Sequence, residues 1–195
     1  MKNNIKITAI IMASGLSKRM GTDKLILPFR RKLLFQHILD TLEKIAFEEI
    51  IIVTTNEKIM DYAKKKGITA VVNDDAYKGQ SASILKGLEN SPKSDGYMFI
   101  VADQPFLSEE TIQTLINVFS KNPDKIVMPF FKGAKGNPVI FPHRVKKDLM
   151  KITGDQGGSV VIKKEWENAV KIGFNNALEG LDIDTMENYN KYKEN

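Results

Sequence analysis

The alternation of short apolar segments with segments of helical periodicity constrains the fold more than any other feature. Strand-like runs lie at Ile5–Ala13, Glu49–Thr54, Thr69–Val72 and Tyr97–Val101. Between and after them, apolar residues follow helical spacing at Leu33–Ala46, Lys58–Lys66, Ser81–Glu89 and Ser108–Ser120. Continuously apolar strands that alternate with helices are typical of a parallel sheet covered on both faces. We therefore expect an α/β fold, a three-layer sandwich with a mostly parallel central sheet.

The second half of the chain is less regular. Short strands are predicted at Ile126–Met128, Val139–Phe141 and Val170–Ile172, and helices at Val145–Met150, at Ser159–Lys164 and after Thr185. No Pro/Gly/Ser-rich linker, internal repeat or low-complexity tract interrupts the pattern, and 195 residues is the length of one ordinary domain. We expect a single domain over residues 1–195.

Composition excludes several classes of site and of partner. Without cysteine there is no disulfide, thiolate nucleophile or Cys-ligated zinc, and His37 and His143 lack metal-ligand spacing. The net charge of +5 comes from lysines spread along the chain, with no basic stripe interleaved with aromatics, so nucleic acid is not an expected partner. Apolar runs are too short to span a membrane, and no signal peptide is recognised, so we expect a cytoplasmic protein.

The segment GLSKRMGTDK, Gly15–Lys24, follows the first strand and combines two glycines, one serine and three cations with a single carboxylate. Ligands of α/β sheets bind outside the carboxyl ends of strands, and glycines let backbone amides approach an anion. A polyphosphate would suit this segment, although its spacing is not that of a Walker A loop and no G-x-G-x-x-G occurs in the chain. Taken alone, the segment is equally compatible with a basic surface turn.

Carboxylates occur at two further places. Asp103 follows the strand Tyr97–Val101, and Asp182 and Asp184 lie one residue apart in LDIDT. Carboxylates opposite a basic phosphate loop are suited to Mg²⁺ bridged to a nucleotide. The alternatives are a turn at Asp103 and a helix cap at Asp184 and Thr185.

The segment ASGLSKRMGTDKLILPF resembles the signature A-x-G-x-S-x-R-M-G-x-x-K-x-L-L-P of nucleotidyltransferases with a Rossmann-like sheet, of the nucleotide-diphospho-sugar transferase type. The resemblance implies that the nucleotide base approaches Ala13, Ser14 and Gly15. It also implies that the β- and γ-phosphates are surrounded by Ser17, Arg19, Gly21 and Lys24. VADQP and DIDTMENY match the family's metal-binding segments. They imply Mg²⁺ on Asp103 and Asp184, with Asp182 as the alternative ligand, and catalytic roles for Arg19, Lys24 and Asp103.

Three more blocks are similar to the branch of this superfamily that attaches nucleotides to molybdopterin, the molybdenum cofactor cytidylyltransferases. NDDAYKGQSASILKGLE implies further nucleotide contacts from Asn73, Gly79, Ser81 and Ser83. GNPVIFP and LMKITGDQGGSVV imply that the second substrate is received by Asn137, Gly154, Asp155 and Gly157.

The function implied by this resemblance is transfer of CMP from CTP to the terminal phosphate of molybdopterin, with release of pyrophosphate. A transient contact with a molybdenum hydroxylase is a further expectation. Three alternatives remain: a guanylyltransferase that uses GTP, a sugar-phosphate nucleotidyltransferase, and a carrier of molybdenum cofactor without catalysis. Two metal-positioned carboxylates argue against the carrier, since binding alone does not need them.

The chain departs from the family pattern in three places. Ser14 replaces a small apolar residue at the position that steers cytosine against guanine, and Arg30-Arg31-Lys32 occupies a loop that normally contains glycine. Gly158-Ser159 replaces Ala-Arg after G-D-x-G, which leaves the acceptor's identity open. Lys135 or Lys163 would have to compensate for that arginine.

Overall fold

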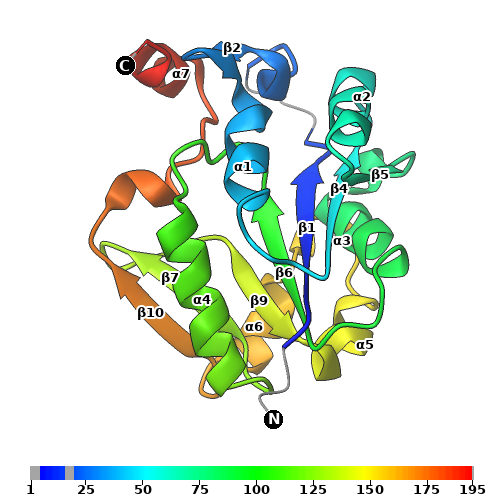
Figure 1. The fold of residues 1–195 in the computed structure, drawn as a ribbon. Coiled ribbons are helices and arrows are strands. Elements are labelled where there is room, and N and C mark those ends of the chain that lie inside the picture. Colours follow the sequence, from blue (N-terminus) through cyan, green and yellow to red (C-terminus); the bar gives the residue numbers. More distant parts are fainter. Residues whose placement is uncertain (1–4, 16–19, 195) are drawn as a thin grey trace.

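The computed structural model describes residues 5–15 and 20–194 and is built around one eight-stranded sheet (Figure 1). The strand order is β10-β7-β9-β6-β1-β4-β5, and β8 pairs with β7. The strands are β1 Ile7–Ala13, β4 Glu49–Thr54, β5 Thr69–Val72, β6 Gly96–Val101, β7 Val127–Phe131, β8 Ala134–Lys135, β9 Val139–Pro142 and β10 Val170–Phe174.

The sheet is mostly parallel, as the sequence predicts. Strands β5, β4, β1 and β6 run parallel to one another, and β10 runs parallel to β7. Strand β9 is antiparallel to both of its neighbours, β6 and β7. In the aligned register Met12 pairs with Val53 and with Val101, so β1, β4 and β6 end at the same edge of the sheet.

Helices cover both faces of this sheet and make three layers. They are α1 Leu34–Leu42, α2 Glu57–Lys65, α3 Gln80–Glu89, α4 Glu109–Lys121, α5 Lys146–Leu149, α6 Ser159–Lys164 and α7 Met186–Tyr192. Ile7, Ala9 and Ile11 of β1 share one core with α1, α2, α4 and α7, whereas Ile10 shares a second core with α3, α5 and α6. Successive side chains of a strand point to opposite faces, so β1 contributes to both cores. The predicted α/β sandwich is confirmed.

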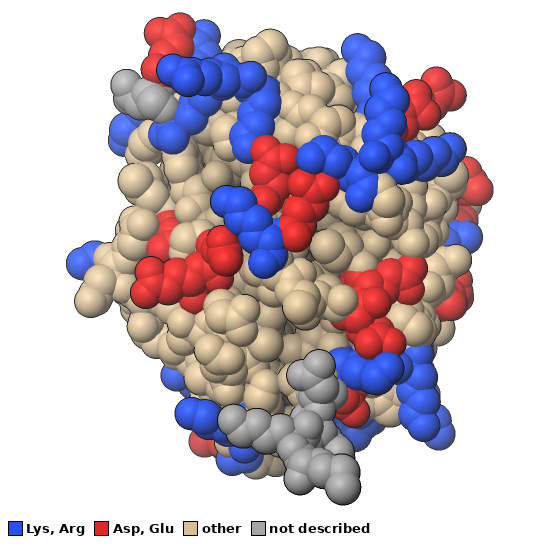
Figure 2. Space-filling model, in the orientation of Figure 1, with Lys and Arg blue, Asp and Glu red and all other residues tan. Residues whose placement is uncertain are grey.

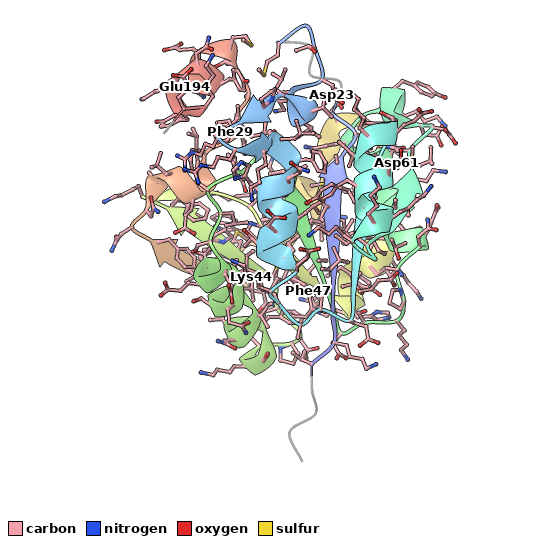
Figure 3. The ribbon with its side chains drawn as sticks, turned by 45° about the horizontal axis from the view of Figure 1, so that its top comes forward. Asp23, Phe29, Lys44, Phe47, Asp61 and Glu194 are labelled. Atoms are coloured by element: carbon pink, nitrogen blue, oxygen red, sulfur yellow. The ribbon has the colours of Figure 1, made fainter. Side chains whose placement is uncertain are left out.

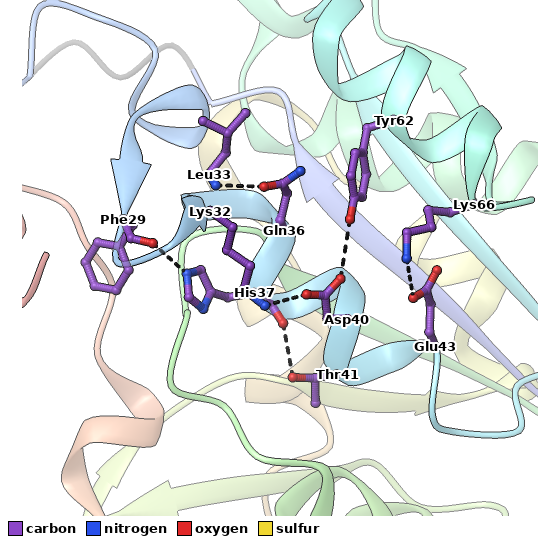
Figure 4. A network of polar contacts seen from close by, with 10 residues as sticks. All are labelled: Phe29, Lys32, Leu33, Gln36, His37, Asp40, Thr41, Glu43, Tyr62 and Lys66. Carbon is purple, nitrogen blue, oxygen red and sulfur yellow. Dashed lines mark hydrogen bonds and ion pairs between the residues drawn. The ribbon is translucent and has the colours of Figure 1, made fainter. Parts of the chain in front are cut away.

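A small hairpin that the sequence does not predict, β2 Pro28–Phe29 and β3 Lys32–Leu33, lies between β1 and α1 along the chain. Polar contacts join it to α1, and α1 is in turn joined to α2 (Figure 4). A ring nitrogen of His37 lies 3.0 Å from the Phe29 carbonyl oxygen, and Lys32 forms an ion pair with Asp40, which also accepts a hydrogen bond from Tyr62. The hairpin therefore holds a defined position above α1.

Figure 3 shows Asp23 and Phe29 at the end of the molecule where β1 stops, with Lys44 and Phe47 beyond the other end of α1. The face that carries α1, α2 and α4 has Lys and Arg side chains interspersed with Asp and Glu (Figure 2). Among the described residues, none of the helices combines the length and the apolar character needed to cross a bilayer.

Candidate active site

The carboxyl ends of β1 and β6 open into a cavity of about 540 Å³. Its wall is completed by the 3₁₀ turn Lys24–Ile26, the loop before α3 with the first turn of that helix, and the segment before α7. Asn137 and Asp155, from segments later in the sequence, also line the cavity. The cavity thus lies where parallel α/β sheets bind their ligands.

Lys24 is held inside this cavity by the turn that it begins. Asp23 caps the turn by accepting a hydrogen bond from the Leu25 amide (3.1 Å), and its second oxygen accepts one from Asn56 (2.6 Å). Lys24 is only 8% exposed. Burial by itself would lower the pKa of Lys24, but two neighbouring carboxylates outweigh burial, so this pKa is raised and the side chain is a cation.

Those carboxylates belong to Asp103 and Asp184. The Lys24 ammonium donates hydrogen bonds to Asp103 Oδ2 and to Asp184 Oδ1, both at 2.5 Å. Asp103 follows β6, and its carbonyl accepts a hydrogen bond from the Ile183 amide (3.0 Å), which ties the segment before α7 to the end of the sheet. Thr185 caps α7 through the Asn188 amide (3.1 Å), so Asp184 itself is not the cap.

The donor set suits a hard divalent cation. Asp103 Oδ1 is buried and has no hydrogen-bond partner among the described residues, so this carboxylate has an acceptor position that Lys24 does not use. Within residues 5–15 and 20–194, no three acidic or histidine side chains converge as a ready-made metal site. A cation here would take carboxylate oxygens and complete its shell with substrate oxygens, which is the usual habit of Mg²⁺.

Asp182 lies on the same wall. Burial raises the pKa of Asp182 to about 6, with the negative charge of Asp103 acting in the same direction. Gln104 donates a hydrogen bond to Asp182 Oδ1 (2.8 Å), which opposes the rise. Sequence reasoning missed Gln104, and its only signal was its place directly after Asp103.

Some of the residues predicted to contact the nucleotide lie on the cavity wall, in the loop before α3 and in the first turn of that helix. Gly79 and Ser83 line the cavity, whereas Asn73 and Ser81 are buried and are not on its wall. Asn73 nevertheless reaches the cavity indirectly, because its amide donates a hydrogen bond to Ser83 Oγ (3.1 Å). Tyr77, which the sequence did not single out, also lines the cavity and is 73% exposed at its rim.

Of the residues predicted to contact the base and the phosphates, only some line the cavity. Ser14 and Gly15 line the cavity, and the Ser14 hydroxyl donates a hydrogen bond to the Val53 carbonyl (3.0 Å). Ala13 is the buried last residue of β1, and neither it nor Gly21 lies on the wall. Ser17 and Arg19 fall in residues 16–19, outside the described residues.

The predicted second-substrate residues divide between two cavities. Asn137 and Asp155 line the large cavity, and Gly157 lines a neighbouring cavity of about 200 Å³. The two cavities share Met12, Gln80, Val101 and Asn137, so they are contiguous. Gly154 lines neither cavity, although it begins the 3₁₀ turn Gly154–Gln156 that carries Asp155.

The departures at residues 158 and 159 fall on the smaller cavity. Gly158 faces Phe141 so closely that a Cβ atom would lie 2.8 Å from the phenylalanine ring, so alanine does not fit here without movement. Lys135 lines the same cavity. Burial lowers the pKa of Lys135, and the charge of nearby Lys163 lowers it further, so two cations lie close together beside this cavity.

Comparison with known families agrees with this geometry. The family model of the MobA-like NTP transferase domain matches residues 9–170. A protein of Natranaerobius thermophilus named "Probable molybdenum cofactor guanylyltransferase" is 32% identical over 130 residues, which are 65% of this chain and 62% of that protein, less than two thirds of its length. The "Molybdenum cofactor cytidylyltransferase" of Escherichia coli is 32% identical over 140 residues, 69% of each chain.

Solved structures share the fold. The Mycobacterium tuberculosis protein Rv0371c has a TM-score of 0.84 and 24% identity over 98% of both chains. A structure of the same protein in complex with manganese has a TM-score of 0.80 and 22% identity, and it covers 96% of this chain and 98% of the other. The family match spans most of the sequence and confirms the resemblance carried by its motifs. The chain belongs to the MobA-like NTP transferase family and is a nucleotidyltransferase.

Proposed function

We propose that this enzyme transfers CMP from CTP to the terminal phosphate of molybdopterin, with GTP as the alternative donor. The observation that carries the proposal is the Lys24 cation between Asp103 and Asp184 on the wall of a 540 Å³ cavity at the carboxyl end of the sheet. The names of related proteins support molybdopterin as acceptor and include both guanylyl and cytidylyl forms, so they leave the choice of base open.

The donor nucleotide would lie across the large cavity. Ser14 and Gly15 are available to the base, together with Gly79 and Ser83 on the opposite wall. Its phosphates would extend toward Lys24, and we propose that Ser17, Arg19 and Gly21 would supply further donors to them. The Asn73 to Ser83 hydrogen bond would position the serine hydroxyl for the nucleotide.

The reaction needs positioning and charge stabilisation rather than a protein nucleophile. An oxygen of the acceptor's terminal phosphate attacks the α-phosphorus of the donor, and the bond from that phosphorus to the bridging oxygen of pyrophosphate breaks. Asp103 and Asp184 would hold Mg²⁺, which when bound neutralises charge on the reacting phosphates. A manganese complex of Rv0371c supports a divalent cation. Lys24 and Arg19 would stabilise the departing pyrophosphate.

The acceptor would enter from the side of Asn137 and Asp155 and extend into the 200 Å³ cavity beside Gly157. Gly154 would contribute through the turn that presents Asp155. Because the cavity wall draws on residues from Met12 to Asp184, we propose that residues 1–195 act as one catalytic domain. A cytoplasmic location and a transient contact with a molybdenum hydroxylase remain part of the proposal.

The test is pyrophosphate release by the purified enzyme with CTP, GTP, ATP or UTP, with and without molybdopterin. We expect release with molybdopterin and CTP, or GTP if the alternative holds. If pyrophosphate were released only when a sugar phosphate is added, the acceptor would be that sugar phosphate and not molybdopterin. Tight nucleotide binding without pyrophosphate formation would favour the non-catalytic carrier.

The residue roles have a separate test. Removing one preorganised group that contacts the reacting phosphates should lower turnover by about two orders of magnitude. We expect this loss for Asp103→Asn and for Arg19→Ala. Lys66→Met, which breaks a surface pair with Glu43 remote from the cavity, is the control. Near-wild-type turnover in both site variants would refute the assignments.

A further inference from the structure

One cation of the protein itself already bridges the two carboxylates that would hold a metal. The Lys24 ammonium lies 2.5 Å from an oxygen of Asp103 and 2.5 Å from an oxygen of Asp184, and its side chain is 10% exposed. Lys24 also lines the cavity in which the triphosphate is proposed to bind. It therefore has access to two kinds of anion, the carboxylates and the substrate phosphates.

We propose that Lys24 occupies the cation position while the nucleotide is absent, and that it moves onto the triphosphate when cation and nucleotide bind together. The inference rests on the proposed function, because it assumes that a divalent cation and a triphosphate meet in this cavity. It adds that the divalent cation binds only weakly to Asp103 and Asp184 when no nucleotide is present. Lys24 thus acts as a positioning residue for the carboxylates before it contacts the substrate.

The charges of the site explain why the two positions of Lys24 should be coupled. Carboxylates removed from water repel each other and are costly to bury without a partner. Lys24 supplies that partner by donating a hydrogen bond to each of them, so Asp103 and Asp184 are held together without a metal. A divalent cation between them would repel the ammonium, and a buried ammonium that leaves its carboxylates needs another anion. The triphosphate provides that anion.

The shape of the lysine side chain permits the exchange. An ammonium on a flexible four-carbon stem can change partners without movement of the backbone. The backbone is held independently, because the cap at Asp23 is fastened to Leu25 and to Asn56. Asp103 Oδ1, which is buried and has no partner among the described residues, offers the cation an oxygen that Lys24 does not use.

The test measures binding of Mn²⁺ alone, without nucleotide, by electron paramagnetic resonance of the free ion. Wild type, Lys24→Met and the control Lys66→Met are compared, and Lys66 is likewise paired with a carboxylate, Glu43, at 2.9 Å. We expect Lys24→Met to bind Mn²⁺ at least about tenfold more tightly than wild type, because a competing positive charge has been removed. Lys66→Met should match wild type. Equal affinity in wild type and Lys24→Met overturns the proposal.

Two further measurements make the result independent of how well Lys24→Met folds. Lys24→Gln keeps a polar side chain and should also bind Mn²⁺ more tightly than wild type. Crystals of wild type soaked with Mn²⁺ alone should keep Lys24 between the carboxylates, whereas Mn²⁺ with CTP should place the ion there. Mn²⁺ between Asp103 and Asp184 of wild type without nucleotide overturns the proposal. If wild type still releases pyrophosphate in the nucleotide assay, the proposed function holds and only the inference about Lys24 fails.

Discussion

At the scale of single residues, Asp182 shows how the fold alters an ordinary carboxyl group. Burial and the charge of Asp103 raise the pKa of Asp182 to about 6, from 3.8. Between these two pH values the folded state binds more protons than the unfolded state. The contribution of Asp182 to stability is therefore greatest at low pH, is lost as the pH rises from about 4 to about 6, and is constant above that.

Asp182→Asn should therefore stabilise the protein at neutral pH. The variant has no ionised carboxyl to bury, and its amide oxygen can still accept the hydrogen bond from Gln104. We expect a gain of about 1 kcal/mol in the free energy of unfolding at pH 7.5, after allowance for partial exposure to solvent. Urea unfolding should show a smaller gain at pH 5. A gain of the same size at both pH values would contradict the pKa assignment.

Lys135 and Lys163 are the residues that could replace the arginine missing after G-D-Q-G. Burial and the charge of Lys163 both lower the pKa of Lys135, which lines the smaller cavity. Two neighbouring cations beside a cavity favour an anionic group of a ligand, which under the proposed function belongs to the acceptor.

Lys135→Ala and Lys163→Ala should therefore weaken acceptor binding. Loss of one charged contact corresponds to about a tenfold rise in KM for the acceptor, with KM for the nucleotide unchanged. Lys164→Ala, at the next position of α6, is the matched control for Lys163→Ala. Steady-state kinetics with varied acceptor concentration measure the effect. If KM for the nucleotide rose instead, both lysines would be assigned to binding of the donor nucleotide.

At the scale of elements, the N-terminus of α3 closely approaches the turn Gly154–Gln156, and both contribute to the wall of the large cavity. Gly79 has a φ of 97°, and a Cβ atom there would lie 2.4 Å from Asp155 Oδ1 and 2.7 Å from the Gly154 carbonyl carbon. The Gln80 amide lies 3.3 Å from the same Asp155 oxygen. Only glycine allows this contact without displacement of one element.

Gly79→Ala should move these two elements apart. Gly67→Ala is the matched control, because Gly67 also has a positive φ (71°) but has open space where a Cβ would lie. Both variants carry backbone strain, and Gly79→Ala adds a clash, so we expect it to lose about 1 to 3 kcal/mol more stability in urea unfolding. It should also weaken nucleotide binding, which Gly67→Ala should not. Equal losses in the two variants would show that the close approach is unimportant.

At the scale of the whole molecule, the C-terminal helix α7 is joined to the hairpin of β2 and β3 (Figure 1). The Tyr189 hydroxyl of α7 donates a hydrogen bond to the Pro28 carbonyl (2.5 Å), and the Arg30 amide donates one to the Lys193 carbonyl (2.7 Å). The hairpin follows Lys24 in sequence and α7 follows Asp184. The contacts between the hairpin and α7 therefore help to keep Lys24 next to Asp184, which is 160 positions away in the sequence.

Tyr189→Ala should weaken the contact between α7 and the hairpin. It should lower the free energy of unfolding by about 3 kcal/mol, since the ring is buried in the core with Phe29. Tyr189→Phe removes only the hydroxyl and should cost about 1 kcal/mol. Urea unfolding measures both, and turnover should fall more in Tyr189→Ala. If the two variants lost the same stability, the hydrogen bond rather than the ring would be the important contact.

The sequence predicts the regular elements well where the apolar pattern is strong. Strands Glu49–Thr54 and Thr69–Val72 and helix Ser159–Lys164 have the predicted bounds, because local periodicity reports burial directly. The helix predicted to Ala46 ends at Leu42, although Ile45 stays buried and continues the apolar pattern beyond the helix. The two-residue strands of the hairpin are too short to show any period, so sequence reasoning missed them.

The sequence by itself determined the α/β class, the family and the chemical types of the site residues, because these depend on local patterns and on motifs of adjacent residues. Only the tertiary structure decided that β9 runs antiparallel, that Ser81 is buried and not on the cavity wall, and that Gln104 donates a hydrogen bond to Asp182. It also decided that Lys24 binds two carboxylates 79 and 160 positions away. Such contacts depend on how distant segments meet around the sheet, which no local pattern encodes.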